Sequence, residues 1–376
     1  NGGTGSSLLV LGKGGAYAVF DHNVFNITGS SGNILSANQF VGQGDAPEHV
    51  SYTNNVLYNS QPGSAFCYAM TVSGSGNLVE NNTIYHNGSG ILNQYGASSS
   101  GNVYRNNTLY GNTNFNPSAN SIVENNKIYA TTNIAANTTV IGNTFQNVAI
   151  SGTNTTFANN DVTGTVTVSG NENTIVDNEI TATTEYAIDL KSTKNNTVTG
   201  NTLHASELAG DASVKYVEGN DNIVENNYPL VIDIIIDGQT AWVGTNSTVT
   251  VTVPNGTGNV TIKIGNRVYN EIPLVNGAVT VDVLSDDLVL GENAISVDYN
   301  GDEFILPGHS NGNLQVVDGV ITNETYKYYF DEKGNLASFV PDGATLDFQG
   351  LFLGKYPVYI DKSVNVISST GDALFN

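Results

Sequence analysis

The sequence predicts an all-β chain in which a right-handed parallel β-helix is followed by an Ig-like β-sandwich and a C-terminal, β-rich segment that caps a β-helix. Three observations lead to this prediction. An asparagine motif recurs about every twenty residues over residues 1–228, two-residue alternation of apolar and polar side chains follows, and an aromatic-rich segment comes last. A chain of 376 residues is long enough for two or three domains, each with its own core.

The first region, residues 1–228, carries the repeat. The stretch GNLVENNTIY at 76–85 returns as GNVYRNNTLY at 101–110 and as NSIVENNKIY at 120–129. A period near twenty with insertions is typical of a solenoid with variable loops, and we expect about eleven coils. The first repeat anchors are Asn23, Asn38 and Asn55. The asparagines expected at the corners of later coils are Asn77, Asn82, Asn102, Asn107, Asn126, Asn143, Asn160, Asn178, Asn201 and Asn227.

Apolar residues stand at fixed distances from these asparagines. Val79 lies three residues before the anchor Asn82 and Ile84 lies two residues after it, and the other coils are apolar at the same positions. Strand alternation directs such residues inward. Asparagine and glycine suit the corners, because they tolerate left-handed backbone and hydrogen-bond locally. We therefore expect stacked coils with an asparagine amide ladder between them, wound right-handed as the crossover rule requires.

The second region, residues 229–308, shows clean two-residue alternation. The stretches STVTVTV, NVTIKI and AVTVDV are separated by turns rich in Gly, Asn and Pro. Six or seven strands in about eighty residues predict a small Ig-like sandwich. The region has no cysteine pair and its Trp242 comes early, so we do not expect an antibody-type domain.

The third region, residues 309–376, is rich in aromatic residues. Its stretches TLDFQG, VYIDKSVNVISST and DALFN resemble the opening coils of a β-helix. A β-helix needs its first coil covered, since an open end exposes unpaired strand edges and an apolar core. The sequence therefore predicts a β-helix-opening or capping segment here.

Together these stretches resemble the adhesin-like surface proteins of methanogenic archaea. The resemblance rests on the NNTxY coils, on GENAISVDYNGDEF, and on the order YYFDEKGNL, LDFQGLF, VYIDKSVNVISS. It covers nearly the whole chain and implies a large, secreted, often glycosylated cell-surface protein with β-helices and Ig-like modules. It implies no catalytic residues and no cofactor.

The order of the regions suggests how subunits join. The family's usual order places the YYFDEKGNL opening before the coils, whereas here it comes last, and STGDALFN could be followed naturally by NGGTGSSLLVLG. We expect residues 309–376 of one subunit to cap the region near residues 1–20 of an identical subunit, giving a head-to-tail filament or linear array. Two alternatives stay open: a piece of a longer chain, or a C-terminal domain that folds back.

Charge and composition exclude several classes of partner. The formal net charge is −22 with only 12 Lys and Arg, so the surface repels nucleic acid and anionic lipid. No apolar run is long enough to span a membrane, so no membrane insertion is expected. The single Cys67 excludes an internal disulfide framework, and no Cys/His spacing indicates a metal.

A carbohydrate-binding or carbohydrate-active protein is the alternative function, because β-helices also support lyases, epimerases and glycosidases. Such chemistry needs acids and a base on one face. We expect the available groups to form a solvated polar face and not a catalytic site; they are Asp161, Asp177, Glu179, Glu185, Asp189, Lys191 and Lys194.

Aromatic residues one place beyond the inward position form a file on the outside of the coils. They are Tyr58, Tyr85, Tyr110 and Tyr129. Adjacent coils would space them about 4.8 Å apart. The file could bind sugar rings of a cell-surface polysaccharide or of partner-cell glycans, or stack as a ladder that stabilises the sheet; we favour the ladder.

Glycan-acceptor sequons are frequent in this Asn- and Thr-rich chain. They begin at Asn26, Asn81, Asn87, Asn106, Asn137, Asn154, Asn195, Asn246, Asn255, Asn259 and Asn323. We select Asn87, Asn246 and Asn255 as the better acceptors, because they fall in expected loops.

Acids near turns, at 298–302 and 331–334, lack a calcium-loop pattern, so ordinary turn chemistry is expected there.

Overall fold

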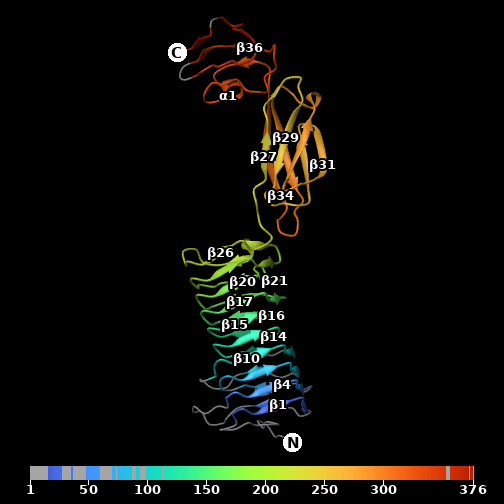
Figure 1. The fold of residues 1–376 in the computed structure, drawn as a ribbon, viewed down its shortest axis with the longest axis vertical. Helices are drawn as coiled ribbons and strands as arrows, with labels where there is room; N and C mark the ends of the chain where they lie inside the picture. The colour runs from blue at the N-terminus through green and yellow to red at the C-terminus, as the bar shows by residue number, and fades with distance from the viewer. Residues whose placement is uncertain are drawn as a thin grey trace. The chain divides into compact units, whose positions relative to one another are not determined.

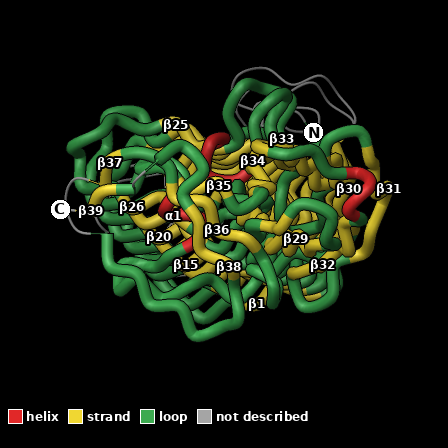
Figure 2. Tube along the Cα trace, turned by 90° about the horizontal axis from the view of Figure 1, so that it is seen from above, coloured by secondary structure: helices red, strands yellow, loops and turns green. Residues whose placement is uncertain are grey.

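The computed structural model describes residues 16–27, 35–36, 48–59, 70–72, 74–86, 90–93, 99–111, 114–352, 356–371 and 373–375. The chain divides into two compact units, Asn1–Leu230 and Val231–Asn376. Within the described residues nearly all regular structure is strand joined by turns, with short helical segments (Figure 2). The predicted all-β class is confirmed.

The described residues of the first unit form a parallel β-helix, in which strands of successive coils lie one above another (Figure 1). One side of the coil is a ten-stranded sheet within the described residues. In spatial order its strands are β1 (Val19–Asp21), β4 (Ser51–Thr53), β7 (Leu78–Glu80), β10 (Val103–Arg105), β13 (Ile122–Glu124), β15 (Thr139–Ile141), β17 (Thr156–Ala158), β20 (Thr174–Val176), β23 (Thr197–Thr199) and β26 (Ile223–Glu225).

Sixteen further strands line the rest of the described coils as one connected sheet. The strands that directly follow the first side are β2 (Val24–Ile27), β5 (Val56–Asn59), β8 (Thr83–His86), β11 (Thr108–Tyr110), β14 (Lys127–Ile134), β16 (Thr144–Ile150), β18 (Asp161–Val162), β21 (Glu179–Thr181) and β24 (Thr202–His204). Those that complete the coil are β3 (Leu35–Ser36), β6 (Met70–Thr71), β9 (Gly90–Asn93), β12 (Asn114–Asn116), β19 (Val166–Val168), β22 (Ile188–Asp189) and β25 (Val214–Lys215). A 3-10 turn, Gly210–Ser213, lies in the last coil.

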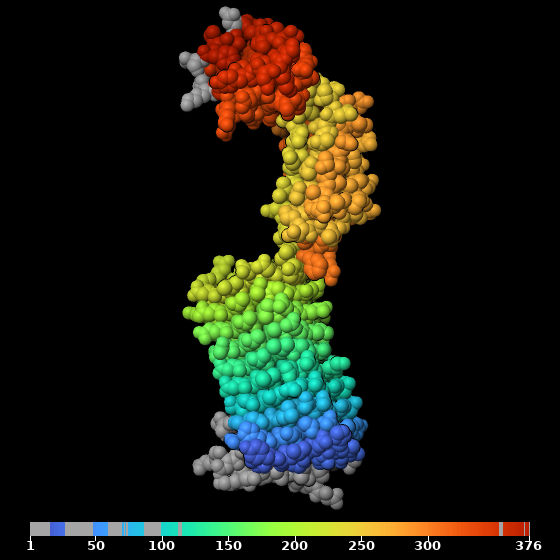
Figure 3. Space-filling view, viewed as in Figure 1, coloured from blue at the N-terminus to red at the C-terminus, as the bar shows by residue number. Residues whose placement is uncertain are grey.

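The core of this unit consists of columns of inward side chains. Val79 in β7 lies between Tyr52 and Tyr104 of the neighbouring coils, and all three are fully buried. Ile84 in β8 occupies the same place in the next column. Figure 3 shows the coils as successive layers, graded from blue to yellow-green. The inward positions predicted from the repeat are therefore the positions that form the core.

The first described coil is longer than the repeat suggested. β1 pairs directly with β4, and Asn23 hydrogen-bonds to Asn55, 32 residues away. The anchor assigned to Asn38, which lies outside the described residues, therefore adds no coil between them. The first side has ten strands within the described chain, one fewer than the eleven anchors read from the sequence. Asn38 matches the repeat pattern, but it stands in the long sequence segment between β2 and β4.

The second unit contains a two-sheet sandwich around one core. Its three-stranded antiparallel sheet comprises β27 (Ile235–Gly238), β29 (Ser247–Thr252) and β32 (Ala278–Val283). Its five-stranded sheet comprises β28 (Ala241–Trp242), β34 (Gly308–Val317), β33 (Gly291–Tyr299), β30 (Asn259–Ile264) and β31 (Arg267–Pro273). A second 3-10 turn is Ser285–Asp287.

The sandwich extends beyond the boundary predicted at residue 308. β34 pairs with the whole length of β33, from Tyr299 opposite Gly308 to Gly291 opposite Val316. The boundary is therefore corrected to Val317. This strand is hard to predict from the sequence, because its first half, GHSNGN, has no apolar alternation.

The remaining described residues form two short parallel coils. β36 (Thr345–Phe348) pairs with β38 (Asn365–Ile367), and β37 (Leu351–Phe352) pairs with β39 (Leu374–Phe375). β35 (Val320–Ile321) pairs with the other edge of β36. The short helix α1 (Tyr326–Tyr329) belongs to the same apolar core, as does the partly buried Trp242. These strand pairs are parallel, and the assignment of the segment as a β-helix opening or cap stays a prediction.

Candidate functional site

An unbroken column of asparagines runs along one corner of the β-helix. The Oδ1 of Asn143 accepts hydrogen bonds from both the main-chain N and the Nδ2 of Asn126, each at 2.9 Å. The Nδ2 of Asn143 in turn donates to Asn160 Oδ1 and to the carbonyl of Val123. Each amide in the middle of the column is thus fully hydrogen-bonded inside the protein, as burial requires. The column comprises Asn23, Asn55, Asn82, Asn107, Asn126, Asn143, Asn160, Asn178, Asn201 and Asn227.

The column ends on a carboxylate. Asn227 donates from its main-chain N and from Nδ2 to Asp211 Oδ1, at 3.0 and 2.7 Å. Asp211 lies in the 3-10 turn of the last coil, and sequence reasoning did not select it. No repeat signal could identify it, because it stands in an irregular loop where an asparagine motif is missing.

A second, interrupted ladder follows another corner. The main-chain N of Asn77 donates to Asn102 Oδ1 at 2.9 Å, and Asn173 donates in the same way to Asn196. Between these pairs the corner carries smaller buried polar residues, Ser121, Thr138 and Thr155. Asn77 and Asn102 therefore serve a different corner from Asn82 and its column.

The left-handed backbone at the first corner belongs to the residue before the ladder asparagine. Asn81 has φ 55° and Asn106 has φ 53°, whereas Asn82 and Asn107 are buried and have no positive φ. The sequence-based expectation gave both properties to one asparagine. The structure divides them between two adjacent residues, because the residue that turns the chain points outward while the next one points into the coil.

This division explains why sequons fall at the corners. Asn-Asn-Thr reads as a turning asparagine, a ladder asparagine and the threonine that begins the next strand, as at 81–83 and 106–108. The first asparagine of each corner sequon is exposed, at Asn81, Asn106, Asn137, Asn154 and Asn195. These side chains are accessible to a glycosyltransferase, whereas the ladder asparagines are not.

The sequons selected from the sequence have varied positions. Asn246 and Asn255 are exposed, and Asn246 uses its Oδ1 to accept a hydrogen bond from the main-chain N of Ser285 at 2.9 Å. Asn87 lies outside the described residues, as does Cys67. Asn26 and Asn323 are also exposed, whereas Asn259 is half-buried.

The four tyrosines of the outer file stack on one another. Tyr85 and Tyr110 have ring centroids 4.8 Å apart and an interplanar angle of 6°, and Tyr110 and Tyr129 are 5.3 Å apart at 11°. Tyr58 is tilted against Tyr85 by 58° at 6.0 Å. Tyr110 therefore has a ring stacked on each face and Tyr85 has one stacked face, which leaves less ring face for solvent than four isolated tyrosines would. Sugar rings bind to aromatic faces, so this geometry favours the stacking ladder.

The acids singled out in the sequence do not gather in one common site, whereas Glu80 and Glu124, on the two strands that flank Arg105, both form ion pairs with it. Asp161 and Glu179 lie side by side on adjacent strands and are exposed, as are Asp177 and Glu185. Asp189 forms an ion pair with Lys191 at 2.5 Å. Burial opposes ionisation of Asp189, but the hydrogen bonds and charge of Lys191 outweigh it and lower the pKa of this carboxyl.

The acids at the turns are occupied by main-chain donors. Asp302 accepts hydrogen bonds from the main-chain N of Thr257 and Phe304, and Asp331 accepts them from Lys333 and Asn335. Such bonds are ordinary turn chemistry. No group of three or more His, Cys, Asp or Glu side chains gathers in a metal-binding arrangement anywhere in the described ranges.

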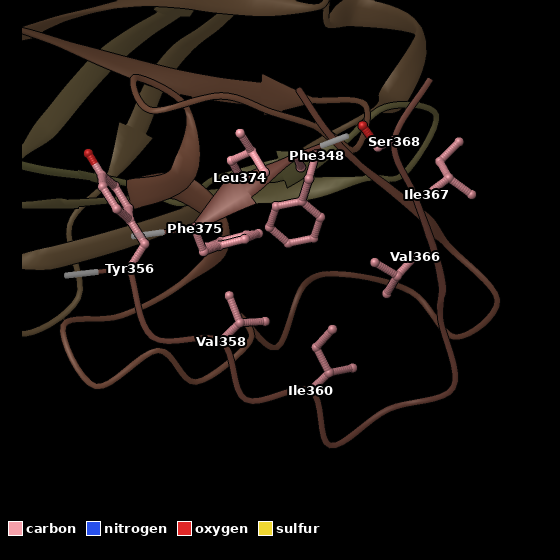
Figure 4. A pocket seen from close by; sticks show the side chains of 10 residues that line it. Phe348, Tyr356, Val358, Ile360, Val366, Ile367, Ser368, Leu374 and Phe375 are labelled. Atoms are coloured by element: carbon pink, nitrogen blue, oxygen red, sulfur yellow. The ribbon is translucent and has the colours of Figure 1, made fainter. Parts of the chain in front are cut away.

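The two coils of the second unit end in an open, apolar groove of about 720 Å³ (Figure 4). Leu346 and Phe352 in the earlier coil are fully buried, whereas Val366 and Phe375, which pair with them, are 56% and 50% exposed. The groove is lined by Phe348, Tyr356, Val358, Ile360, Val366, Ile367, Ser368, Ala373, Leu374 and Phe375. Side chains that elsewhere form a core are here half in solvent.

Comparison with family models agrees with this geometry. Residues 48–203 match the right-handed β-helix region. The match spans the coils from β4 to β24 and supports a right-handed winding of the β-helix. Neither the curated proteins nor the solved structures give a match. The β-helix fold supports both enzymes and non-enzymes, so the family assigns no reaction.

Among the described residues, no helix is both long enough and apolar enough to span a membrane.

Proposed function

We propose that this chain is an extracellular structural and adhesive protein of the cell surface that joins identical subunits head to tail. The observation that carries the proposal is the open apolar coil at β38 and β39, a β-helix surface with no covering coil in the described residues. A second β-helix end is the kind of surface that covers such a coil. The resemblance to adhesin-like archaeal surface proteins supports the extracellular location.

The rest of the described chain suits a rod. Every coil from β4 to β23 is joined to the next by main-chain hydrogen bonds on the first side, by inward columns of buried side chains and by the asparagine column. Solenoids of this kind gain length by adding coils, with each coil contacting only its neighbours. This construction supports a function as a spacer between a surface and its partner.

Two arrangements support a non-enzymatic function over the carbohydrate-active alternative. The acids singled out in the sequence are largely exposed, and Glu80 and Glu124 are held in ion pairs by Arg105, whereas glycoside or uronate chemistry needs two positioned groups across one substrate. The stacking of Tyr110 between Tyr85 and Tyr129 covers ring faces that a sugar would need. Adhesion through glycans on the exposed corner sequons is compatible with both arrangements.

Assembly is tested with substitutions in the open coil. We expect the purified chain to form filaments by negative-stain electron microscopy, and V366D to remain monomeric by sedimentation velocity, because a carboxylate would be buried in an apolar joint. V275D is the matched control, since Val275 is 70% exposed in a sandwich turn of the same unit. Circular dichroism checks that both variants fold.

Two results would contradict the proposal: a wild-type chain that stays monomeric at high concentration, or V366D filaments as abundant as those of the wild type. A variant that lacks the C-terminal coils would also test assembly, but it must keep all residues up to Val317. A cut at 309 would remove β34 from the middle of the sandwich sheet and unfold the domain that is meant to stay intact.

A further inference from the structure

The open coil and the first described coil of the β-helix present complementary strand edges. β38 and β39 pair on one edge with β36 and β37, while β1 and β2 pair on one edge with β4 and β5. Among the described residues, the other edge of these four strands has no strand partner. β38 and β39 belong to the later coil of their stack, and β1 and β2 to the earlier coil of theirs. The free edges therefore have the polarity that parallel stacking requires.

The apolar columns also end at these edges. Phe375 stacks on Phe352 with centroids 4.7 Å apart and an interplanar angle of 9°. Phe20 stacks on Tyr52 at 5.4 Å and 9°. Phe25, which pairs with Leu57, is half-buried although the corresponding position of every later described coil is fully buried. Each end thus carries two inward apolar positions that lack a covering coil among the described residues.

We propose that β38 and β39 of one copy pair in parallel with β1 and β2 of a second copy, in the register that continues both apolar columns. Val366 then lies on Phe20 of the second copy, and Phe375 lies on Phe25 of the second copy. Asn365 lies beside Val19 of the second copy. This inference rests on the proposed function, because it assigns the strands and the register of the joint between subunits.

A second β-helix coil fits this surface better than other apolar ligands do. A lipid chain or a sugar placed in the groove leaves the main-chain N–H and C=O groups along the free edges of β38 and β39 without strand partners. A parallel strand satisfies those groups and covers the half-exposed side chains together. The aromatic pair at the joint, Phe375 with Phe25, adds the specific stacking geometry already seen within each stack.

Cysteine cross-linking tests the register. All variants carry Cys67→Ser. In V19C/N365C the new thiols lie in register, and adjacent parallel strands place their Cα atoms about 5 Å apart, within the range of a disulfide. In V19C/I367C they lie two residues out of register on the same outward face, about 8 Å apart, which a disulfide does not span. Mild oxidation followed by non-reducing electrophoresis gives the readout.

We expect V19C/N365C to form a ladder of covalent oligomers with at least ~10-fold higher yield than V19C/I367C. Equal yields, or a higher yield from V19C/I367C, would overturn the register; if filaments still form in that case, the proposed function stands. A Cys67→Ser parent that forms no filaments and stays monomeric would overturn both. Capture of that monomer on a cell-surface polysaccharide, lost in V366D, would assign the groove to a carbohydrate and also overturn both.

Discussion

At the scale of single residues, two adjacent asparagines have different structural roles at one corner of the coil. The first turns the chain in left-handed backbone and is exposed, and the second is buried and joins its coil to both neighbours. The two positions have different requirements. Any residue that tolerates positive φ suits the first, whereas only a group that both donates and accepts suits the second.

The ladder position is tested by Asn143→Ala. This substitution leaves the buried main-chain N of Asn126 without its acceptor, so we expect the free energy of unfolding to fall by about 2–3 kcal/mol. Urea unfolding followed by circular dichroism measures the change. Asn133→Ala is the control, because Asn133 is exposed on β14, and a change of less than about 0.5 kcal/mol is expected there. Equal effects of the two substitutions would contradict the ladder's contribution.

The turning position is tested at Asn125, which has φ 55°. Asn125→Gly should change the free energy of unfolding by less than about 0.5 kcal/mol, because glycine adopts this backbone freely. Asn125→Val should lower it by about 1–2 kcal/mol, because a β-branched side chain is strained there. The same urea assay applies. A valine variant as stable as the glycine variant would show that the left-handed backbone is not required.

The sequence predicted the ladder but not the division within each corner. The repeat places Asn82, its inward neighbours and the coil period at fixed spacings, and these spacings follow directly from strand alternation and stacking. The adjacent Asn81 shares the residue type but not the environment, and only main-chain angles separate the two. Asp211 has the environment of a ladder residue but not its residue type or its place in the repeat, so the motif could not identify it.

At the scale of elements, the carboxylate of Asp302 in the turn 299–305 connects two loops of the sandwich by hydrogen bonds. Burial opposes ionisation of Asp302, but hydrogen bonds from the main chain and hydroxyl of Thr257 and from the main chain of Phe304 outweigh it and lower its pKa to about 2. A pKa below the unfolded value of 3.8 stabilises the folded state above that pH. The stabilisation is lost as the pH falls from about 4 to about 2.

Asp302→Asn should remove this pH dependence. At pH 7 we expect a loss of about 1 kcal/mol in the free energy of unfolding, because a neutral amide accepts weaker hydrogen bonds. Between pH 4 and pH 2 the variant should lose less further stability than the wild type. Urea midpoints across this range, followed by Trp242 fluorescence, measure the difference. Parallel curves for the two proteins would assign the acid sensitivity to other groups.

The elements of the second unit show where sequence patterns are weak. Alternation identified β29, β30 and β32, whose apolar faces are regular. It missed the first half of β34, whose polar residues are held by hydrogen bonds to β33 and not by burial of their own side chains. The open groove was also invisible in the sequence, because Val366 and Phe375 look like any other inward residue until the absence of a covering coil is seen in the described structure.

At the scale of the whole molecule, net charge acts on assembly. Two copies with a formal charge of −22 each repel, so salt should promote their joining. We expect the rate of filament growth to rise ~10-fold between 20 and 200 mM NaCl. Light scattering at matched protein concentration measures the rate. A rate that falls with salt would instead indicate attraction between opposite charges at the joint.

The asparagine column gives the β-helix a summed side-chain dipole along its axis. Every ladder amide accepts on its Oδ1 from the coil before and donates from its Nδ2 to the coil after, so the side-chain dipoles from Asn55 to Asn201 align along the stack. Their positive end points toward the last coil, where the carboxylate of Asp211 receives it. As with a charged residue at the end of an α-helix, the acid opposes the summed dipole. Stacking coils head to tail extends this alignment, whereas joining two like ends would set the columns against each other.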